Sequence, residues 1–302
     1  MQVGFIGTGH MGNPMALNLI RAGHRLVVHD LRPEAAANLL EAGAVWAVSP
    51  HFVASQVDVL FTSLPGPAEM EHVLTGPNGI LAGARPGLTY FDLTTNSPTV
   101  IRRLAAIAAE RGVTLLDAPV SGGAEGARAG TLSVMVAGDR ATYEAYRDLL
   151  QAIGRNTFYL GDLGSGCALK MVNNLIVFAV QQIVQEGTVL GVKAGLDPAT
   201  LFEVMRVSSA GPYVGRLPEY LDRAYEDAWF TVELAAKDVG LSVQAARDLG
   251  LGLSIAPVVE QNFLRARGRG LGKQNPYAVL RVFEDAAGVE VPPLERGAPE
   301  QT

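Results

Sequence analysis

A glycine pattern near the N-terminus has the spacing of a phosphate-binding turn. Gly7, Gly9 and Gly12 follow the β-branched run 3–6 and open a helical stretch. In that context the first glycine permits a tight turn, the second lets the backbone approach a pyrophosphate, and the third lets the helix pack closely on the strand. The first N–H groups of the helix would then face the phosphates. We therefore predict a dinucleotide site, with these contact residues: Gly7, Thr8, Gly9, His10, Met11 and Gly12.

An acidic residue stands where such sites bind ribose. Asp30 ends the second expected strand, 18 residues beyond Gly12, where a carboxylate accepts bonds from the ribose hydroxyls. This carboxylate would repel a 2′-phosphate and favours NAD, whereas Arg32 could pair with that phosphate and keeps NADP as the alternative. A flavin, or a turn without a ligand, is also compatible with these residues alone. We predict NAD, with contacts from Asp30, Leu31 and Arg32.

A second glycine-rich segment, 117–131, reads as a strand end that runs into a loop. Ligands of open α/β sheets bind beyond the carboxyl ends of the strands, so we expect this loop to face the cofactor cleft. Ser121 and the N–H groups of Gly122 and Gly123 could form a nest for a carboxylate. A purely structural turn is the other interpretation.

A lysine lies early in a long apolar helical stretch. Lys170 and Asn174 are four residues apart and so share one helix face. Burial would lower the pKa of Lys170 and suit it to general acid/base work, although a surface lysine with its stem along the helix is the alternative. The last histidine is His72 and the one cysteine is Cys167. Proton transfer therefore falls to the lysine, and we expect no disulfide and no metal site.

The elements that must position these residues alternate in the first half of the chain. Short β-branched runs separated by alanine-rich stretches predict parallel βαβ units. We expect strands at 3–6, 25–29, 57–62, 89–92, 114–117 and 133–137, and helices at 15–21, 34–41, 98–111 and 141–153. The second half is expected to be helical. Its long helix, 167–191, is apolar nearly all round and should be buried at a domain or subunit junction. Later helices are expected at 198–206, 232–248, 255–267 and 277–285.

Composition narrows the class of protein. A length of 302 residues predicts about two domains. Apolar residues make up 48% and charged residues 18%, which is typical of globular proteins. The net charge of −6 favours neither nucleic acid nor an anionic membrane as partner. With no basic leader and no long unbroken apolar run, we expect no signal peptide and no membrane span, and a cytoplasmic protein. One small basic group is expected to be a solvated loop: Arg265, Arg267, Arg269 and Lys273.

Four segments together resemble the β-hydroxyacid dehydrogenase family, which includes 3-hydroxyisobutyrate dehydrogenase and tartronate semialdehyde reductase. They are GFIGTGHMGNPMALNLIRAGH, DAPVSGGAEGARAGTL, GSGCALKMVNN and AAKDVGLS, and the resemblance covers about residues 1–290. It implies an α/β fold class, with an N-terminal Rossmann domain, a mostly parallel sheet and an all-α domain joined through a long helix. We place the NAD(P)-binding domain at 1–162, the substrate and oligomerisation domain at 163–290, and a tail at 291–302 that frays after Val289.

The resemblance implies hydride transfer between NAD(P) and a short β-hydroxy acid, in a homodimer or homotetramer. Lys170 matches the catalytic lysine, and Asn174 acts with it. The substrate carboxylate and hydroxyl would be held by Ser121, Gly122, Gly123 and Asn174. Further predicted cofactor contacts are Leu64, Pro65, Glu69, Thr95 and Lys237. Lys237 and Asp238, taken alone, would be a solvated helix face, but the resemblance places Lys237 at the cofactor or substrate.

Some residues depart from the family pattern. Asn275 stands where an Asp is usual, and Pro212-Tyr213 stands where a Ser-Trp-like pair is common, which leaves the substrate side chain open. Asn173 occupies the place of a histidine in the related 6-phosphogluconate dehydrogenases, and Lys170 is usually replaced in imine reductases. The alternatives are an NADPH-dependent reductase of glyoxylate or succinic semialdehyde type and, in another class, a non-catalytic NAD-binding sensor. DNA binding is disfavoured by the net charge.

Overall fold

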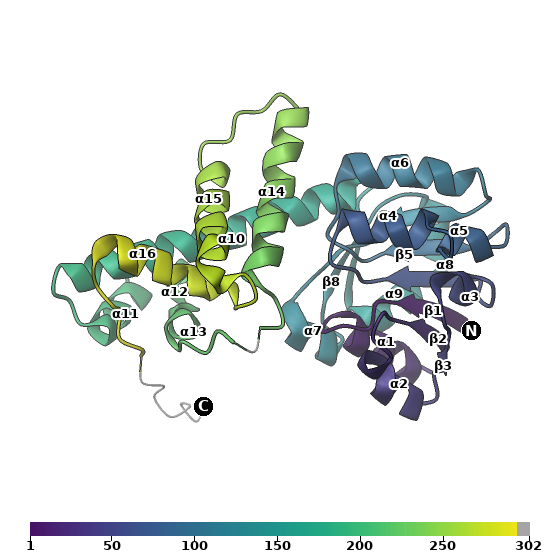
Figure 1. Ribbon diagram of the computed structural model, residues 1–302, viewed down its shortest axis with the longest axis horizontal. Coiled ribbons are helices and arrows are strands. Elements are labelled where there is room, and N and C mark those ends of the chain that lie inside the picture. The colour runs from purple at the N-terminus through teal and green to yellow at the C-terminus, as the bar shows by residue number, and fades with distance from the viewer. Residues whose placement is uncertain (227, 295–302) are drawn as a thin grey trace. The chain divides into compact units, whose positions relative to one another are not determined.

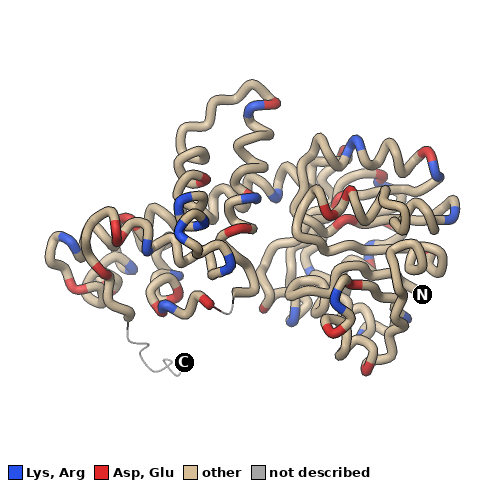
Figure 2. The backbone as a smooth tube through the Cα atoms, in the orientation of Figure 1, with Lys and Arg blue, Asp and Glu red and all other residues tan. Residues whose placement is uncertain are grey.

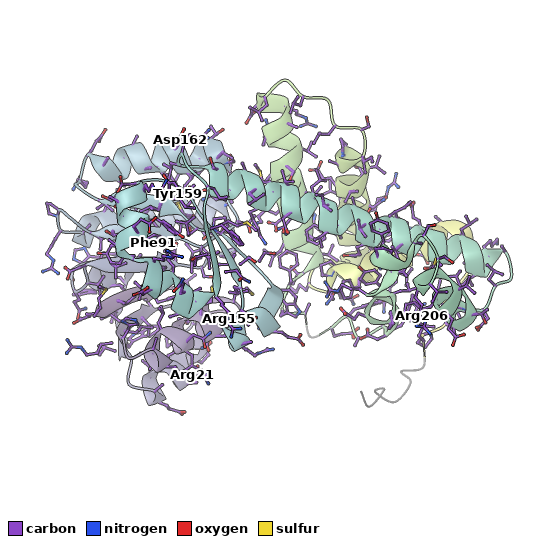
Figure 3. The ribbon with its side chains drawn as sticks, turned by 180° about the vertical axis from the view of Figure 1, so that it is seen from behind. Arg21, Phe91, Arg155, Tyr159, Asp162 and Arg206 are labelled. Carbon is purple, nitrogen blue, oxygen red and sulfur yellow. The ribbon has the colours of Figure 1, made fainter. Side chains whose placement is uncertain are left out.

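The computed structural model describes residues 1–226 and 228–294. The chain separates into two compact units, Met1–Met171 and Val172–Thr302, and the division falls within the long helix α10, Ser165–Lys193. Asp162, at the proposed domain boundary, lies just before that helix begins (Figure 3). The proposed domain limits stay a prediction.

Unit 1, all of whose residues are described, is built on a six-stranded parallel sheet of order β3-β2-β1-β4-β5-β6. The strand order reverses between β1 and β4, and ligands of doubly wound sheets bind at such a switch point. The predicted α/β fold class with a Rossmann sheet is confirmed. The strands are β1 Gln2–Ile6, β2 Arg25–His29, β3 Val45–Trp46, β4 Val59–Thr62, β5 Thr89–Asp92 and β6 Thr114–Asp117.

Helices cover both faces of this sheet, with α4, α5 and α6 on one side and α1 and α2 on the other (Figure 1). Successive strand residues face opposite sides. Phe5 and Phe91 accordingly join one core cluster, while Ile6 and Tyr90 join the other. The helices are α1 Gly12–Arg21, the 3₁₀ turn Pro33–Ala36, α2 Ala37–Glu41, α3 Pro50–Ala54, α4 Pro67–Thr75, α5 Ile80–Gly83, α6 Pro98–Ala109, α7 Gly123–Ala129, α8 Arg140–Ala145 and α9 Arg147–Ile153.

A second, three-stranded sheet completes unit 1. Its order is β7-β8-β9, with β7 Val120–Ser121 antiparallel to β8 Ser133–Val136, and β9 Asn156–Tyr159 parallel to β8. Two sequence predictions are wrong here. The expected glycine-rich loop forms helix α7, and the helix expected over 141–153 is divided at Tyr146, whose φ of −110° and ψ of 13° are not helical.

Helix α10 carries polar side chains that are buried in unit 2 and hydrogen-bonded to its backbone. The Nε2 atoms of Gln181, Gln182 and Gln185 donate to the carbonyl oxygens of Pro276, Val259 and Tyr277 at 2.9, 3.0 and 2.8 Å. By length and composition alone α10 would be long and apolar enough to cross a membrane. These three amides instead find main-chain partners inside unit 2, as expected of a core helix.

Unit 2 is helical in its described residues. Its helices after α10 are α11 Pro198–Arg206, α12 Gly211–Val214, α13 Leu217–Leu221, α14 Val232–Asp248, α15 Ala256–Ala266, a π-helix at Arg267–Leu271, a 3₁₀ turn at Pro276–Val279 and α16 Leu280–Ala287. Arg206 marks the end of α11 (Figure 3). Asp197 caps α11, because its carboxylate accepts from Thr200 N at 2.9 Å.

Two other expectations for unit 2 are wrong. The four basic residues are exposed as expected, but the segment is largely helical rather than a loop: Arg267 and Arg269 lie in the π-helix, and Arg269 pairs with Asp285 at 2.6 Å. Basic and acidic residues are interspersed along this part of the backbone (Figure 2). The tail does not fray directly after Val289, because Val291 is fully buried and its N–H donates to Glu284 at 2.7 Å. The end of the proposed tail, residues 295–302, lies outside the described residues.

Candidate active site

The glycine turn between β1 and α1 has the predicted geometry. Gly7 has a φ of +87°, and a Cβ there would lie 2.3 Å from the Ser63 carbonyl oxygen. A Cβ on Gly12 would lie 1.8 Å from the Gly7 carbonyl oxygen, whereas one on Gly9 would meet nothing within 4 Å. Gly7 and Gly12 are therefore required for packing. Gly9 faces open space, which suits the approach of a pyrophosphate.

Asp30 closes the same turn. Its Oδ2 accepts from the backbone N–H of Thr8 at 2.8 Å, and its Oδ1 accepts from the backbone N–H of Arg32 at 2.9 Å. An ionised carboxylate has about four lone-pair sites, so acceptor capacity remains for a ribose hydroxyl. A pocket of about 600 Å³ borders the turn. Its lining includes Thr8, Gly9, His10, Arg21, Arg32 and Arg128. The backbone donors and guanidinium groups fit the phosphates of a dinucleotide.

A buried carboxylate fixes the loops that follow β4 and β5. Asp92 Oδ1 accepts from Thr62 Oγ1 at 2.8 Å and from Thr94 N at 3.1 Å, and Oδ2 accepts from Asn96 Nδ2 at 3.2 Å. Thr94 Oγ1 in turn accepts from Leu64 N at 3.2 Å. Burial raises the pKa of Asp92. Leu64 and Thr95, both predicted cofactor contacts, thus belong to loops joined by one hydrogen-bonded network.

The predicted carboxylate nest lies at the end of β7. Gly122 and Gly123 have φ values of +132° and +66°, a conformation that favours glycine, and α7 begins at Gly123. Ser121 is half-buried and ends β7. Consecutive N–H groups in such a turn can point together at an anion. Their role in binding a substrate stays a prediction.

Lys170 and Asn174 lie one turn apart on α10, as predicted, with Lys170 half-buried and Asn174 buried. Both polar atoms of the Asn174 side-chain amide are hydrogen-bonded. Its Nδ2 donates to Asp238 Oδ2 at 2.6 Å, and its Oδ1 accepts from Asn173 Nδ2 at 3.0 Å. Lys237 Nζ lies 2.7 Å from Asp238 Oδ1. Unit 2 therefore brings three groups together: Asn174, Lys237 and Asp238.

Asp238 was absent from the predicted site residues, although it is 2% exposed and holds two of them. The signal was the Lys237-Asp238 pair itself, since a charged pair within an alanine-rich helix can be buried only with a partner. Two predicted contacts have no support of this kind from the structure. Leu31 is 95% exposed, and Glu69 lies exposed in the first turn of α4. Both stay predictions.

A doubly wound sheet with this glycine turn defines a protein that binds a dinucleotide. Two family models match the chain. The NAD binding domain of 6-phosphogluconate dehydrogenase matches residues 2–161, and the NAD-binding domain of NADP-dependent 3-hydroxyisobutyrate dehydrogenase matches residues 164–283. The chain belongs to the β-hydroxyacid dehydrogenase family and is an NAD(P)-dependent oxidoreductase acting on CH–OH groups.

Relatives agree along nearly the whole chain. The chain is 36% identical over 293 residues to 2-(hydroxymethyl)glutarate dehydrogenase of Eubacterium barkeri, covering 96% of this chain and 97% of the relative. It is 40% identical over 262 residues to 3-hydroxyisobutyrate dehydrogenase of Pseudomonas aeruginosa, covering 82% and 88%. The crystal structure of 3-hydroxyisobutyrate dehydrogenase from Salmonella typhimurium superposes with a TM-score of 0.84 at 29% identity, covering 93% of this chain and 99% of that one.

Proposed function

We propose that this protein reversibly oxidises a short β-hydroxy acid to the corresponding aldehyde or keto acid, with NAD as the preferred cofactor. Relatives are named for 3-hydroxyisobutyrate, 2-(hydroxymethyl)glutarate and L-serine. These three compounds share a carboxylate and a CH₂OH group on the neighbouring carbon. The observation that carries the proposal is Asn174, buried and held by Asp238 one turn beyond Lys170.

The proposed reaction needs an anion site, a base and a hydride acceptor. Ser121 and the N–H groups of Gly122 and Gly123 bind the substrate carboxylate. Lys170, in its neutral form, takes the hydroxyl proton during oxidation and returns it during reduction. Asn174, whose amide cannot rotate without losing its two hydrogen bonds, orients the substrate oxygen. The nicotinamide, when bound, supplies the site that accepts or donates the hydride.

The cofactor preference rests on Asp30. A carboxylate at the position of Asp30 supports NAD, because it would repel a 2′-phosphate on the ribose. One observation supports the NADPH-dependent reductase as second candidate. Arg21, Arg32 and Arg128 all line the pocket beside the glycine turn, and a guanidinium there could pair with the extra phosphate.

We also propose that the protein is a homodimer or homotetramer. Val172, Ile176, Ile183 and Leu190 of α10 are 54, 57, 62 and 70% exposed in the single chain. Their spacing of four, seven and seven residues places them on one stripe of the helix. A stripe of this kind on a long helix supports association with a second copy.

The deciding experiment is a turnover screen. The purified protein is given serine, 3-hydroxyisobutyrate, 3-hydroxypropionate, glycerate, threonate and γ-hydroxybutyrate, each with NAD and with NADP. We expect at least one β-hydroxy acid to reduce NAD with a higher kcat/KM than NADP. Preference for NADP would favour the second candidate. Binding of NAD without turnover of any compound would favour the non-catalytic sensor.

A further inference from the structure

Two fully buried carboxylates end neighbouring strands of the large sheet. Asp92 closes β5 and Asp117 closes β6, and the strand register pairs their Cα atoms directly. Burial raises the pKa of each. Such groups are costly to fold unless they are hydrogen-bonded, so their partners show what each carboxylate holds in place.

Asp117 holds the start of α10. Its Oδ1 accepts from the backbone N–H of Gly164 at 2.7 Å, and its Oδ2 accepts from the backbone N–H of Cys167 at 2.7 Å. The N–H groups of a helix's first turn lack partners within the helix, and a negative charge there is favourable. Asp117 therefore caps α10 from a strand end that is 47 residues away from Gly164 along the chain.

Other contacts fix the position of the segment in which α10 begins. Arg102 Nε donates to the carbonyl oxygen of Leu163 at 2.9 Å. Gly164 has a φ of +90°. A Cβ on Gly166 would lie 2.3 Å from the Met135 carbonyl oxygen and 2.8 Å from Asp117 Oδ2. The first turn of α10 thus packs directly against the Asp117 side chain at the end of β6 and against the Met135 backbone of β8.

We propose that Asp117 is the residue that positions Lys170 for proton transfer. Lys170 lies three residues beyond Cys167, one helical turn from the N–H that Asp117 holds. The inference rests on the proposed function, which assigns the proton to Lys170. Fixing the first turn by two hydrogen bonds fixes the direction in which the Lys170 side chain leaves the helix. Misplacing a reacting group by about 1 Å can cost on the order of 100-fold in rate.

Asp92 provides the contrast that makes the proposal testable. It bonds to Thr62 at the end of β4 and to the loop that carries Thr95, where Thr94 in turn accepts from Leu64 N, rather than to α10. Both residues are buried acids at adjacent strand ends, so loss of either should destabilise unit 1 in a similar way. Only Asp117 should act through the lysine.

The test compares Asp117→Asn with Asp92→Asn on the best substrate of the turnover screen. An asparagine at 117 keeps the shape but accepts only one of the two N–H bonds. We expect kcat to fall by about 10- to 100-fold, with the KM for NAD changed by less than about threefold. Asp92→Asn is expected to do the reverse, raising the KM for NAD more than it lowers kcat.

Asp139→Ala is the matched control. Asp139 is an exposed residue of unit 1 that caps α8 by accepting from Thr142 N at 2.8 Å, and α8 carries none of the predicted site residues. Its loss should lower thermal stability and leave kcat and KM unchanged. Hydrogen exchange gives a readout without turnover: Asp117→Asn should lose protection over 164–170, and Asp139→Ala over 140–145.

The outcomes separate the two proposals. Wild-type kcat in Asp117→Asn, while Lys170→Ala abolishes turnover, would overturn the role of Asp117 alone. Full turnover in Lys170→Ala would overturn the proposed function and this inference with it. If Asp117→Asn fails to fold, Arg102→Ala decides, because it releases the same turn from its exposed side. A several-fold lower kcat with an unchanged KM for NAD would then support the proposal, and an unchanged kcat would refute it.

Discussion

At the scale of single residues, the predicted site depends on polar groups with fixed partners. Asn174 is held on both sides of its amide, Asp30 accepts from two backbone N–H groups, and Asp92 accepts from three donors. Such bonds restrict each group to one orientation, which is what a binding or catalytic group requires. Sequence reasoning found Asn174 and Asp30 from motif spacing. It missed Asp92 as a site-organising residue, because its partners become visible only in the fold.

Replacing Asp30 tests the cofactor preference. Asp30→Ala removes the carboxylate that repels a 2′-phosphate and should reduce the ratio of kcat/KM for NAD over NADP by roughly tenfold, or about 1.4 kcal/mol. Steady-state kinetics with both cofactors measure the ratio. Asp58→Ala, which removes an exposed carboxylate 3.6 Å from Arg85, is the control and should leave the ratio unchanged. An unchanged ratio in Asp30→Ala would show that Asp30 does not discriminate between the cofactors.

The raised pKa of Asp92 predicts a pH dependence of stability. Burial raises the pKa of Asp92 above the ordinary value of 3.8, so the folded state keeps this proton to a higher pH than the unfolded state. The contribution of Asp92 to stability is then greatest below pH 3.8 and declines as pH rises toward the folded-state pKa. Asparagine cannot ionise. The stability of Asp92→Asn relative to wild type should therefore improve as pH rises from about 4 to 6. Urea unfolding across that range checks this, and a constant difference would contradict it.

At the scale of elements, the helix α10 connects most of the predicted chemistry. Its first turn lies on Asp117 in unit 1, and its later turns carry Asn174 and the buried glutamines of unit 2. The long helix was predictable because few residues break its apolar pattern. The division of 141–153 at Tyr146 and the helix α7 were not. Glycine-rich sequence favours a turn by itself, and tertiary packing decided otherwise.

Replacing glycine by alanine should have opposite effects on stability at two positions of α10. A Cβ on Gly166 would overlap the Met135 carbonyl oxygen, whereas one on Gly187 would meet nothing within 4 Å. Gly166→Ala should lower the free energy of unfolding by about 1–3 kcal/mol through overpacking. Gly187→Ala should raise it by up to about 1 kcal/mol, because alanine favours the helix. Denaturant unfolding of both variants measures the pair. Equal changes in the free energy of unfolding would contradict the close packing of Gly166 against Met135.

At the scale of the whole molecule, the fold class was easier to predict from the sequence than the individual strands. The glycine turn, Asp30 and the alternation of strands and helices led to the Rossmann sheet, because each is a local pattern. The strands β3, β7 and β9 were missed. Two of them have only two residues, and β9, Asn156–Tyr159, is short and has no buried residue. Such short segments give too little pattern to be recognised as strands without the neighbours that the fold supplies.

The exposed apolar stripe of α10 predicts that copies of the chain associate through this helix. Ile176 and Ile183 lie on it, and replacing both by Asp would place charges at the centre of an apolar contact. We expect the double variant to sediment as a monomer at concentrations where the wild type is a dimer or tetramer. Exposed Leu249 and Leu251, between α14 and α15, offer a control pair that lies off the stripe. A monomeric wild type, or an unchanged assembly in the α10 variant, would contradict the proposal.

Proton transfer by Lys170 is the step on which the proposed reaction depends. The most direct measurement compares kcat of Lys170→Ala with that of the wild type, on the best hydroxy acid of the screen, alongside the dissociation constant for NAD. Loss of a general base costs about 100- to 10,000-fold in rate, so we predict a fall of that size with NAD affinity unchanged within about twofold. Lys170→Arg should fail in the same way, because a guanidinium cannot give up its proton near neutral pH. A kcat within a few-fold of the wild type in Lys170→Ala would contradict the mechanism.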